Sequence, residues 1–184
     1  MDSQAALWYD GRMLREGASS PPEADVRQRL DEAWSFIRRA YVFQTAARLE
    51  EAIICYKKSI EVYPTAEAHT FLGWTYSAQG RYDRAIEECR RAIRVDPGFG
   101  NPYNDIGAYL IEQGRFSEAI PWLQLATVAT RYDARAFPHL NLGRVYERLG
   151  QWRNALTAYE RALHANPDYL LAVQSLNRLK AMFG

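Results

Sequence analysis

The sequence repeats one short segment three times at nearly constant spacing. The copies are QGRYDRAI from Gln79, QGRFSEAI from Gln113 and LGQWRNAL from Leu149, so that 34 residues separate the first two starts and 36 the next two. A period of this length is one supersecondary unit, and such units are stable only when they stack, because each buries its apolar face on the next. The spacing therefore predicts an array of stacked units rather than a single enzyme core.

Small residues recur at fixed offsets in each copy. A glycine is followed 12 residues later by an alanine, and seven residues after that by a second alanine. Small side chains at these places allow two successive helices to pack closely, which larger ones would prevent. We therefore expect each unit to be a helix hairpin. The triplets are Gly73, Ala85 and Ala92; Gly107, Ala119 and Ala126; and Gly143, Ala155 and Ala162.

A second set of glycines marks the turn inside each hairpin. Gly80, Gly114 and Gly150 stand where the first helix ends, a place at which the chain commonly adopts a left-handed conformation. Asp83 and Ser117 follow, and their side-chain oxygens are suited to capping the second helix. We expect positive φ at the three glycines and N-caps at these two polar residues.

In this register the units resemble the tetratricopeptide repeat family. That family's pattern W-x2-L-G-x2-Y, followed by alanines and a proline, corresponds to HTFLGWTY, YNDIGAYL and HLNLGRVY, with His69, Tyr103 and His139 in place of tryptophan. A weaker copy, RLEEAIICYKKSIEVYP from Arg48 to Pro64, precedes them. The resemblance implies an all-α fold, a right-handed α-solenoid of stacked antiparallel helix hairpins (a TPR superhelix), with a concave groove lined by the first helices.

The register divides the chain into six segments. They are an N-terminal arm (1–19), an extended N-terminal helix with a divergent first repeat (20–65), three further repeats (66–99, 100–135 and 136–169) and a C-terminal capping helix (170–184). Ser20-Pro-Pro-Glu23 has the pattern of a capping box with proline in the first turn, so we expect the extended helix to run from Pro21 to near Thr45. The connection RYDARAF from Arg131 carries two extra residues, and we expect a longer loop there.

Composition limits the class of partner. The chain has 184 residues and a formal net charge of +1, so it has no overall field to attract nucleic acid or an anionic membrane. No segment reaches the ~18 apolar residues that a membrane span needs, and the N-terminus lacks a signal-peptide pattern. Cys55 and Cys89 lack metal-ligand spacing and are interpreted as buried free thiols in a reducing compartment. We therefore expect a cytoplasmic protein without a nucleic-acid or membrane partner.

Motifs for catalysis or cofactor binding are absent from the sequence. It contains no G-x-S-x-G, Walker loop, H-E-x-x-H or C-x-x-C. His69 and His139 share one repeat position on a packing face and are interpreted as structural. GFGNPYNDIG, from Gly98 to Gly107, lacks the Lys-Ser/Thr ending of a phosphate-binding loop. We expect no catalytic residue, no metal and no cofactor.

The family resemblance implies which side chains face the groove. The groove would be aromatic at one end and rich in asparagine and arginine at the other, which suits an extended segment with apolar anchors and an acidic group. Each half of this hypothesis has an alternative. Trp34, Phe71 and Trp74 could instead pack between helices. Arg144 and Arg148 could instead be solvated, or paired with Glu147 or Glu112. The main candidates are Trp34, Arg38, Tyr41, Phe71, Trp74, Asn101, Asn104, Asn141, Arg144 and Arg148; the register adds Ile37, Glu67, Thr70, Ser77, Asp105, Ala108, Ile111, Glu112, Phe137, Leu140 and Glu147, and the capping helix adds Gln174 and Arg178.

One subtype of the family, which holds a C-terminal carboxylate, does not match. Its lysine, asparagine and arginine positions are occupied here by Thr70, Trp74, Asp105, Phe137 and Asn141, and Asp105 would repel an acidic tail. We therefore expect an adaptor or scaffold that binds another partner protein or peptide. The alternative is a secretion-type chaperone that holds an unfolded client, as a homodimer through its N-terminal helix.

The N-terminal arm fits no repeat. ALWYDGRML has apolar residues on both sides of Asp10-Gly11, which indicates a hairpin or tight turn. We expect Leu7, Trp8 and Tyr9 to dock on the chain's own solenoid, with the groove as one place for them. Docking on a second copy or a partner, or a weakly ordered tail, are the alternatives.

Overall fold

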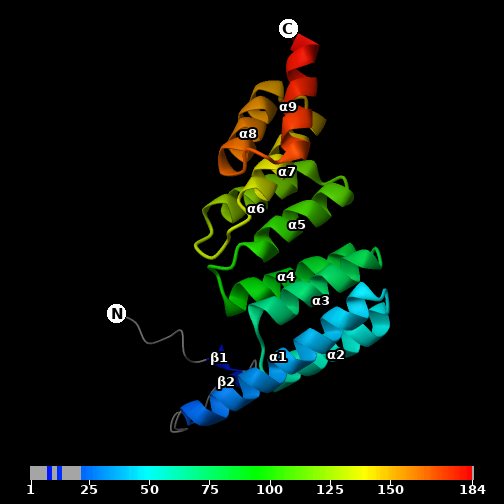
Figure 1. The fold of residues 1–184 in the computed structure, drawn as a ribbon, viewed down its shortest axis with the longest axis vertical. Helices are drawn as coiled ribbons and strands as arrows, with labels where there is room; N and C mark the ends of the chain where they lie inside the picture. Colours follow the sequence, from blue (N-terminus) through cyan, green and yellow to red (C-terminus); the bar gives the residue numbers. More distant parts are fainter. Residues whose placement is uncertain (1–7, 10–11, 14–21, 184) are drawn as a thin grey trace. The chain divides into compact units, whose positions relative to one another are not determined.

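The computed structural model describes residues 8–9, 12–13 and 22–183, which are almost entirely helical (Figure 1). Two short strands, β1 (Trp8–Tyr9) and β2 (Arg12–Met13), pair antiparallel with Trp8 opposite Met13 and Tyr9 opposite Arg12. This pairing agrees with the hairpin expected around Asp10-Gly11, two residues that lie outside the described part of the chain.

The helices of the described residues follow one another as hairpins. Helix α1 begins at Glu23, two residues later than expected, and ends at Thr45 as expected; the predicted cap Ser20 lies outside the described residues. The helices are α1 (Glu23–Thr45), α2 (Leu49–Val62), α3 (Ala66–Ala78), α4 (Tyr82–Val95), α5 (Asn101–Glu112), α6 (Phe116–Val128), α7 (Ala136–Arg148), α8 (Trp152–Ala165) and α9 (Leu170–Phe183).

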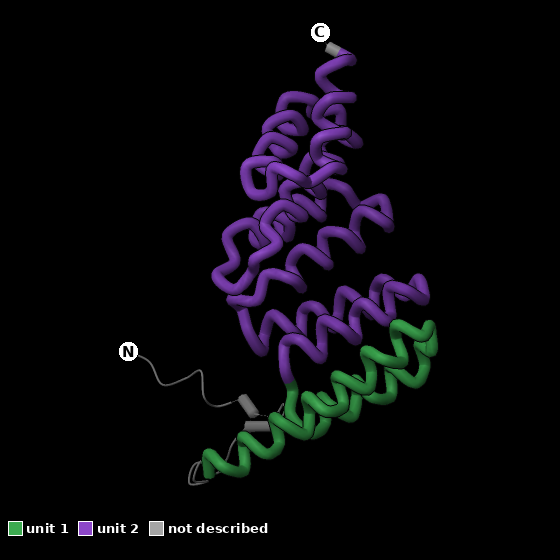
Figure 2. The backbone as a smooth tube through the Cα atoms, viewed as in Figure 1, with its two compact units in different colours: residues 1–64 green, residues 65–184 purple. Residues whose placement is uncertain are grey.

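The chain forms two compact units, residues 1–64 and 65–184, coloured separately in Figure 2. In unit 1, α1 packs on α2 through buried residues that include Ala33, Ile37 and Tyr56. The hydroxyl of Tyr56 donates to Oε1 of Gln44 at 2.8 Å and joins the middle of α2 to the C-terminal end of α1.

Unit 2 is a stack of three hairpins and one further helix. The hairpins are α3–α4, α5–α6 and α7–α8; each second helix also packs on the next first helix, and α8 packs on α9. The first helices touch one another as well, since α5 contacts both α3 and α7. The all-α fold of stacked hairpins that the sequence predicts is confirmed.

Close packing inside the hairpins explains two of the glycines on first helices. A Cβ on Gly143 would lie 2.3 Å from the ring of Tyr159, and one on Gly107 would lie 2.4 Å from Leu123. Both neighbours are fully buried, so neither has room to move aside.

The turns confirm one prediction and correct another. Gly80, Gly114 and Gly150 have φ of 72°, 73° and 68°, as expected. Asp83 and Ser117, however, are not N-caps: Arg81 and Arg115 occupy the cap positions of α4 and α6, without a side-chain hydrogen bond. The physical reason is that the second helix begins at the aromatic residue just before each predicted cap, which places both polar side chains inside the first turn.

The α6–α7 connection is longer than the others, as expected, and it is fixed in place. The backbone N–H of Arg131 donates to the carbonyl of Gly98 at 2.9 Å, and its own carbonyl accepts from Gly100 at 3.1 Å. Its guanidinium pairs with Asp96 at 2.7 Å and with Glu67 at 2.8 Å. These contacts hold the inserted loop against the α4–α5 connection.

Candidate functional site

An open cleft of about 910 Å³ lies in the C-terminal part of unit 2. The end of α5, the start of α6, and helices α7, α8 and α9 line it; we call it the α7–α9 cleft. Leu171, Met182 and Trp152 expose 55%, 58% and 38% of their surface, although they are large apolar residues. The apolar part of the lining consists of Ile111, Phe116, Leu140, Trp152, Leu171 and Met182.

The charges of the cleft are partly neutralised within it. Glu147 accepts a hydrogen bond from the hydroxyl of Tyr159 at 2.5 Å, and both of its carboxylate oxygens lie 2.8 Å from Nη2 of Arg178. Arg144 is exposed, and the described residues provide no carboxylate that pairs with it. The guanidinium of Arg148 lies 5.8 Å from the ring centre of Phe116. Arg144 and Arg148 are therefore the cations of this cleft that no carboxylate of the described residues neutralises.

A polar ladder connects the first helices of unit 2. The indole N–H of Trp74 donates to the carboxylate of Asp105, and the amide of Asn141 donates to Oδ1 of Asn104 at 3.1 Å. Burial raises the pKa of Asp105 to about 7, although its hydrogen bonds from Trp74 and Asn104 act in the opposite direction. The expectation that Asp105 would repel an acidic tail stays a prediction; its carboxyl is buried and bonded to Trp74 rather than exposed on the surface.

The predicted aromatic residues differ in exposure. Phe71 and Trp74 are half-buried, with their rings in edge contact at 5.3 Å, so both pack within unit 2. In unit 1, Trp34 is half-buried, whereas Arg38 and Tyr41 are exposed on α1.

Only some of the predicted groove residues come together in the cleft. Arg144 and Arg148 line it, together with the register positions Ile111, Glu112, Leu140 and Glu147 and with Arg178 of the capping helix. The cleft lining does not include the other main candidates of unit 2, which are Phe71, Trp74, Asn101, Asn104 and Asn141. It also leaves out the remaining added positions, which are Glu67, Thr70, Ser77, Asp105, Ala108, Phe137 and Gln174.

Sequence reasoning missed four apolar residues of the cleft: Phe116, Trp152, Leu171 and Met182. The family register considers only the first helices, whereas these residues lie at the start of second helices and on α9. Phe116 and Trp152 each follow a turn glycine by two positions, and this spacing was the available signal.

The predicted arm contacts stay a prediction. Leu7 lies outside the described residues, and Trp8 and Tyr9 are described only as a strand.

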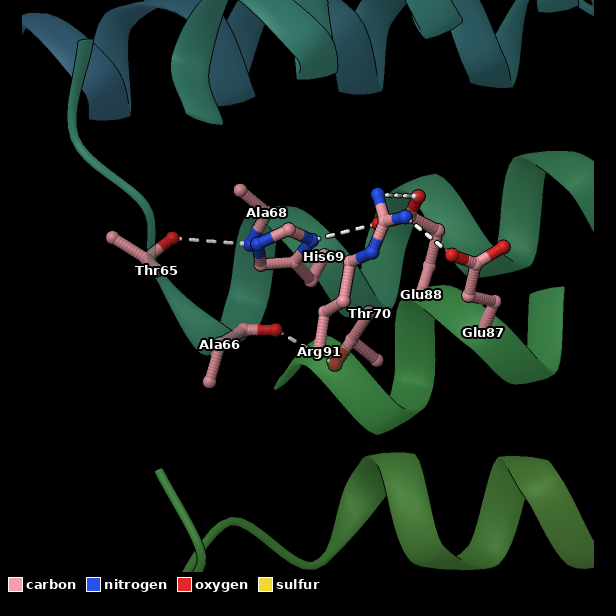
Figure 3. A network of polar contacts seen from close by, with 8 residues as sticks. All are labelled: Thr65, Ala66, Ala68, His69, Thr70, Glu87, Glu88 and Arg91. Carbon is pink, nitrogen blue, oxygen red and sulfur yellow. Dashed lines mark hydrogen bonds and ion pairs between the residues drawn. The ribbon is translucent and has the colours of Figure 1, made fainter. Parts of the chain in front are cut away.

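A buried polar network joins α3 to α4 (Figure 3). Nδ1 of His69 lies 2.7 Å from Oε2 of Glu88, and the other oxygen of Glu88 accepts from Arg91 at 3.0 Å. Arg91 also contacts Glu87, and Thr65 caps α3 by accepting from the N–H of Ala68 at 3.1 Å. Since His69 and Glu88 are both buried, this network is a packing contact within one hairpin.

The remaining chemistry of the described chain is sparse. Cys55 and Cys89 are free and buried, as expected, and burial raises the pKa of the Cys89 thiol. No group of three His, Cys, Asp or Glu residues in the described part is placed to hold a metal ion. Within the same residues, every helix is too short or too polar to cross a bilayer.

Comparison with known proteins gives consistent matches along the chain. Three family models, each described as "Tetratricopeptide repeat", match residues 35–65, 66–99 and 100–168. Among curated relatives, the Anaphase-promoting complex subunit 3 of Schizosaccharomyces pombe is 27% identical over 168 residues, which are 91% of this chain and 25% of that protein. The Type IV pilus assembly protein PilF of Pseudomonas aeruginosa is 28% identical over 155 residues, which are 83% of this chain and 61% of that protein.

The solved structure of Pseudomonas aeruginosa PilF superimposes with a TM-score of 0.77 at 26% identity. The match covers 83% of this chain and 70% of that one. This chain thus spans a quarter of the yeast relative and about three-fifths of the curated PilF sequence.

Proposed function

Because this chain belongs to the tetratricopeptide repeat family, we propose that it is a non-catalytic scaffold that binds a segment of a partner protein in the α7–α9 cleft. Stacked helical repeats offer extended surfaces that suit protein recognition. Two relatives are named for roles in assemblies, one as a complex subunit and one as a pilus assembly protein. These similarities support an interaction role in general, and the cleft supplies the more specific proposal.

The observation that carries the proposal is the apolar lining of the cleft around an available cation. Leu171 and Met182 are more than half exposed, yet both line a concavity that is large enough for several side chains of a ligand. Exposed apolar residues that gather in a concave place are typical of binding sites, since their burial by a partner is favourable.

The charges favour a partner segment with apolar anchors and one carboxylate. Arg178 is already paired with Glu147, so its charge is largely satisfied within the protein. Arg144 has no such partner among the described residues, and an arginine can bind a carboxylate through two parallel hydrogen bonds. The partner's acidic group is therefore expected beside Arg144, and its apolar groups against Leu171 and Trp152.

The other predicted residues extend the proposed surface. Asn101, Asn104 and Asn141 are half-buried on the first helices of unit 2, where amide groups can bond to a partner's backbone. In unit 1, Arg38 and Tyr41 are the exposed candidates.

The proposal is tested by affinity isolation from a lysate of the source organism, with quantitative mass spectrometry. The compared proteins are the wild type, Arg144→Glu, Leu171→Asp and the control Arg153→Glu, which reverses an exposed charge on α8 outside the cleft. A cleft ligand is depleted with both cleft variants and retained by the control. When this ligand is purified, its Kd for Arg144→Glu is expected to be higher than its Kd for the wild type by about tenfold or more. Retention of every binder by the cleft variants contradicts the proposal.

A second candidate function is a chaperone that dimerises through α1. Tyr41 and Val42 expose 55% and 63% of their surface, which supports contact with a second copy or an unfolded client. Light scattering coupled to size-exclusion chromatography tests it: a dimer that Tyr41→Glu dissociates favours this function, and a monomer at all concentrations contradicts it.

We also propose a cytoplasmic location and a protein partner rather than nucleic acid or membrane. Two unpaired cysteines suit a reducing compartment, and a net charge of +1 does not favour polyanions. Cell fractionation tests the location, and recovery with a membrane or extracellular fraction contradicts it.

A further inference from the structure

Two hairpins of unit 2 share a histidine and an arginine at matching positions. In the α3–α4 hairpin, His69 and Arg91 both contact the carboxylate of Glu88, as Figure 3 shows. Seventy positions later, the α7–α8 hairpin has His139 in the place of His69 and Arg161 in the place of Arg91.

The carboxylate between them is missing from the α7–α8 hairpin. Ala158 occupies the position that corresponds to Glu88. Nδ1 of His139 is buried and has no hydrogen-bond partner among the described residues. An unsatisfied buried polar atom is costly and calls for an explanation in the structure.

A small pocket lies at this position. It measures about 240 Å³ and is lined by residues of α6, α7 and α8 that include His139, Asn154, Ala158 and Arg161; we call it the α8 pocket. No aspartate or glutamate lines it, and it shares no lining residue with the α7–α9 cleft. Its volume is below the usual range for drug-sized ligands and suits a single side chain.

The α5–α6 hairpin, which lies between these two in the sequence, fills the position of the α8 pocket in another way. Tyr103 and Trp122 stand in the places of the histidine and the carboxylate, and their rings pack with centres 6.3 Å apart. The space is therefore closed by a carboxylate in one hairpin and by aromatic rings in the next. In the α7–α8 hairpin the short side chain of Ala158 leaves it open.

We propose that the α8 pocket binds the carboxylate of an aspartate or glutamate side chain from a partner protein. This carboxylate would take the place that Glu88 has in the α3–α4 hairpin, with the ring of His139 and the guanidinium of Arg161 as donors. The choice of a carboxylate rests on Glu88, which satisfies the same histidine–arginine pair within the same molecule. The inference goes beyond the proposed function, because it concerns a second contact that does not depend on the cleft.

The electrostatics of the pocket agree with an anionic ligand. Burial and the charge of Arg161 lower the pKa of His139. Tyr146 is the other titratable residue that lines the pocket, and no acid of α6, α7 or α8 faces it there. A bound carboxylate therefore raises the pKa of His139, and by linkage it binds more tightly as the pH falls and His139 becomes protonated.

The test uses N-acetyl-glutamate N-methylamide, which mimics a glutamate residue within a chain. Its binding to the full chain is followed by NMR of the His139 imidazole, at constant ionic strength. We expect a saturable shift of His139, with His69 and His164 unchanged, and a raised pKa of His139. A rise of one pKa unit corresponds to about tenfold tighter binding to the protonated form. The neutral glutamine analogue is expected to give no saturable shift.

Three variants locate the ligand. Arg161→Gln removes an exposed donor and is expected to weaken binding about tenfold or more. Ala158→Glu rebuilds the His69–Glu88–Arg91 arrangement, so it is expected to raise the pKa of His139 without ligand and to abolish binding. Arg144→Glu, in the cleft, is expected to bind the probe like the wild type, so failure of the cleft proposal would not affect this result.

Four results would overturn the inference. They are the absence of a saturable shift, equal binding of the glutamine analogue, unchanged binding by Ala158→Glu, and binding of inorganic phosphate in place of the glutamate mimic. The last would make the pocket a site for small free anions rather than for a partner's side chain.

Discussion

Trp74 on α3 donates its indole N–H to the carboxylate of Asp105 on α5, and this bond joins two neighbouring first helices of unit 2. Asp105 is only 8% exposed, and its burial raises its pKa from 3.8 to about 7. The pair therefore places an acid that titrates near neutral pH between two repeats.

The first prediction concerns the pH dependence of folding stability. Between pH 3.8 and about 7, the folded chain holds a proton on Asp105 that the unfolded chain releases. Binding of this proton therefore contributes on the order of 4 kcal/mol to the free energy of unfolding. The contribution is complete below the unfolded pKa of Asp105 and is lost as the pH rises through about 7. Asp105→Asn, which stays neutral, is expected to exceed the wild type in free energy of unfolding at pH 8 and to approach it at pH 4.

Urea denaturation of both proteins across this pH range measures that difference. Subtracting the two free energies of unfolding at each pH removes the contribution of the other acids, because both proteins contain them. A stability difference that does not change with pH would contradict the role assigned to Asp105.

The second prediction concerns the donor of the same bond. Trp74→Phe keeps a ring beside Phe71 but leaves the buried carboxylate without the indole N–H. We expect a loss of about 1–3 kcal/mol in the free energy of unfolding at pH 8, because a buried acceptor loses its partner. In the Asp105→Asn background the loss is expected to be smaller. Equal losses in both backgrounds would show that the two residues are not coupled.

The third prediction compares glycines on the first helices. Gly143→Ala would place a methyl group 2.3 Å from the ring of Tyr159, whose hydroxyl is also bonded to Glu147. At Gly73 the nearest atoms are 3.2 and 3.3 Å from the added Cβ. We expect Gly143→Ala to cost about 1–3 kcal/mol and Gly73→Ala distinctly less. Thermal or urea unfolding checks the order, and a reversed order would contradict the packing described for these hairpins.

Much of this fold could be predicted from spacing alone. Three copies of one pattern specify the hairpins, and the turn glycines Gly80, Gly114 and Gly150 have the positive φ that their place indicates. These features depend on local geometry, which each repeat specifies for itself.

The features that depend on neighbours could not be predicted in this way. The register placed Asp105 on the groove face, but its burial and its bond to Trp74 depend on how α3 lies against α5. The pairing of Glu147 with Arg178 depends on α9, which lies outside the repeat register. Repeat position therefore indicates which helix face a side chain occupies, whereas its ionisation and its availability to a ligand are set by packing between repeats.

The fourth prediction concerns the α1–α2 turn, where a residue other than glycine has positive φ. Ala47 has φ of 58° at the place in the α1–α2 turn where the hairpins of unit 2 have glycine. A left-handed conformation costs an L-residue roughly 1–2 kcal/mol, and substitution by glycine removes this cost. Part of that stabilisation is lost again, because glycine has greater conformational freedom in the unfolded chain. Ala47→Gly is therefore expected to stabilise the protein by about 0.5–1 kcal/mol, and Gly80→Ala to destabilise it by about 1 kcal/mol. Destabilisation by Ala47→Gly in urea denaturation would contradict the assigned turn geometry.

Site-specific photocrosslinking from the cleft is the sharpest test of partner binding there. Benzoylphenylalanine is placed at Leu171, which is 55% exposed in the α7–α9 cleft, or at the control Leu125, which is 48% exposed on α6 outside it. We predict that one protein crosslinks from position 171 and not from 125. We also predict that this product disappears when Arg144→Glu is added, and that its crosslinked peptide contains an acidic residue among apolar ones. Equal crosslinking from both positions, or a product that persists with Arg144→Glu, would contradict the cleft as the site of partner binding.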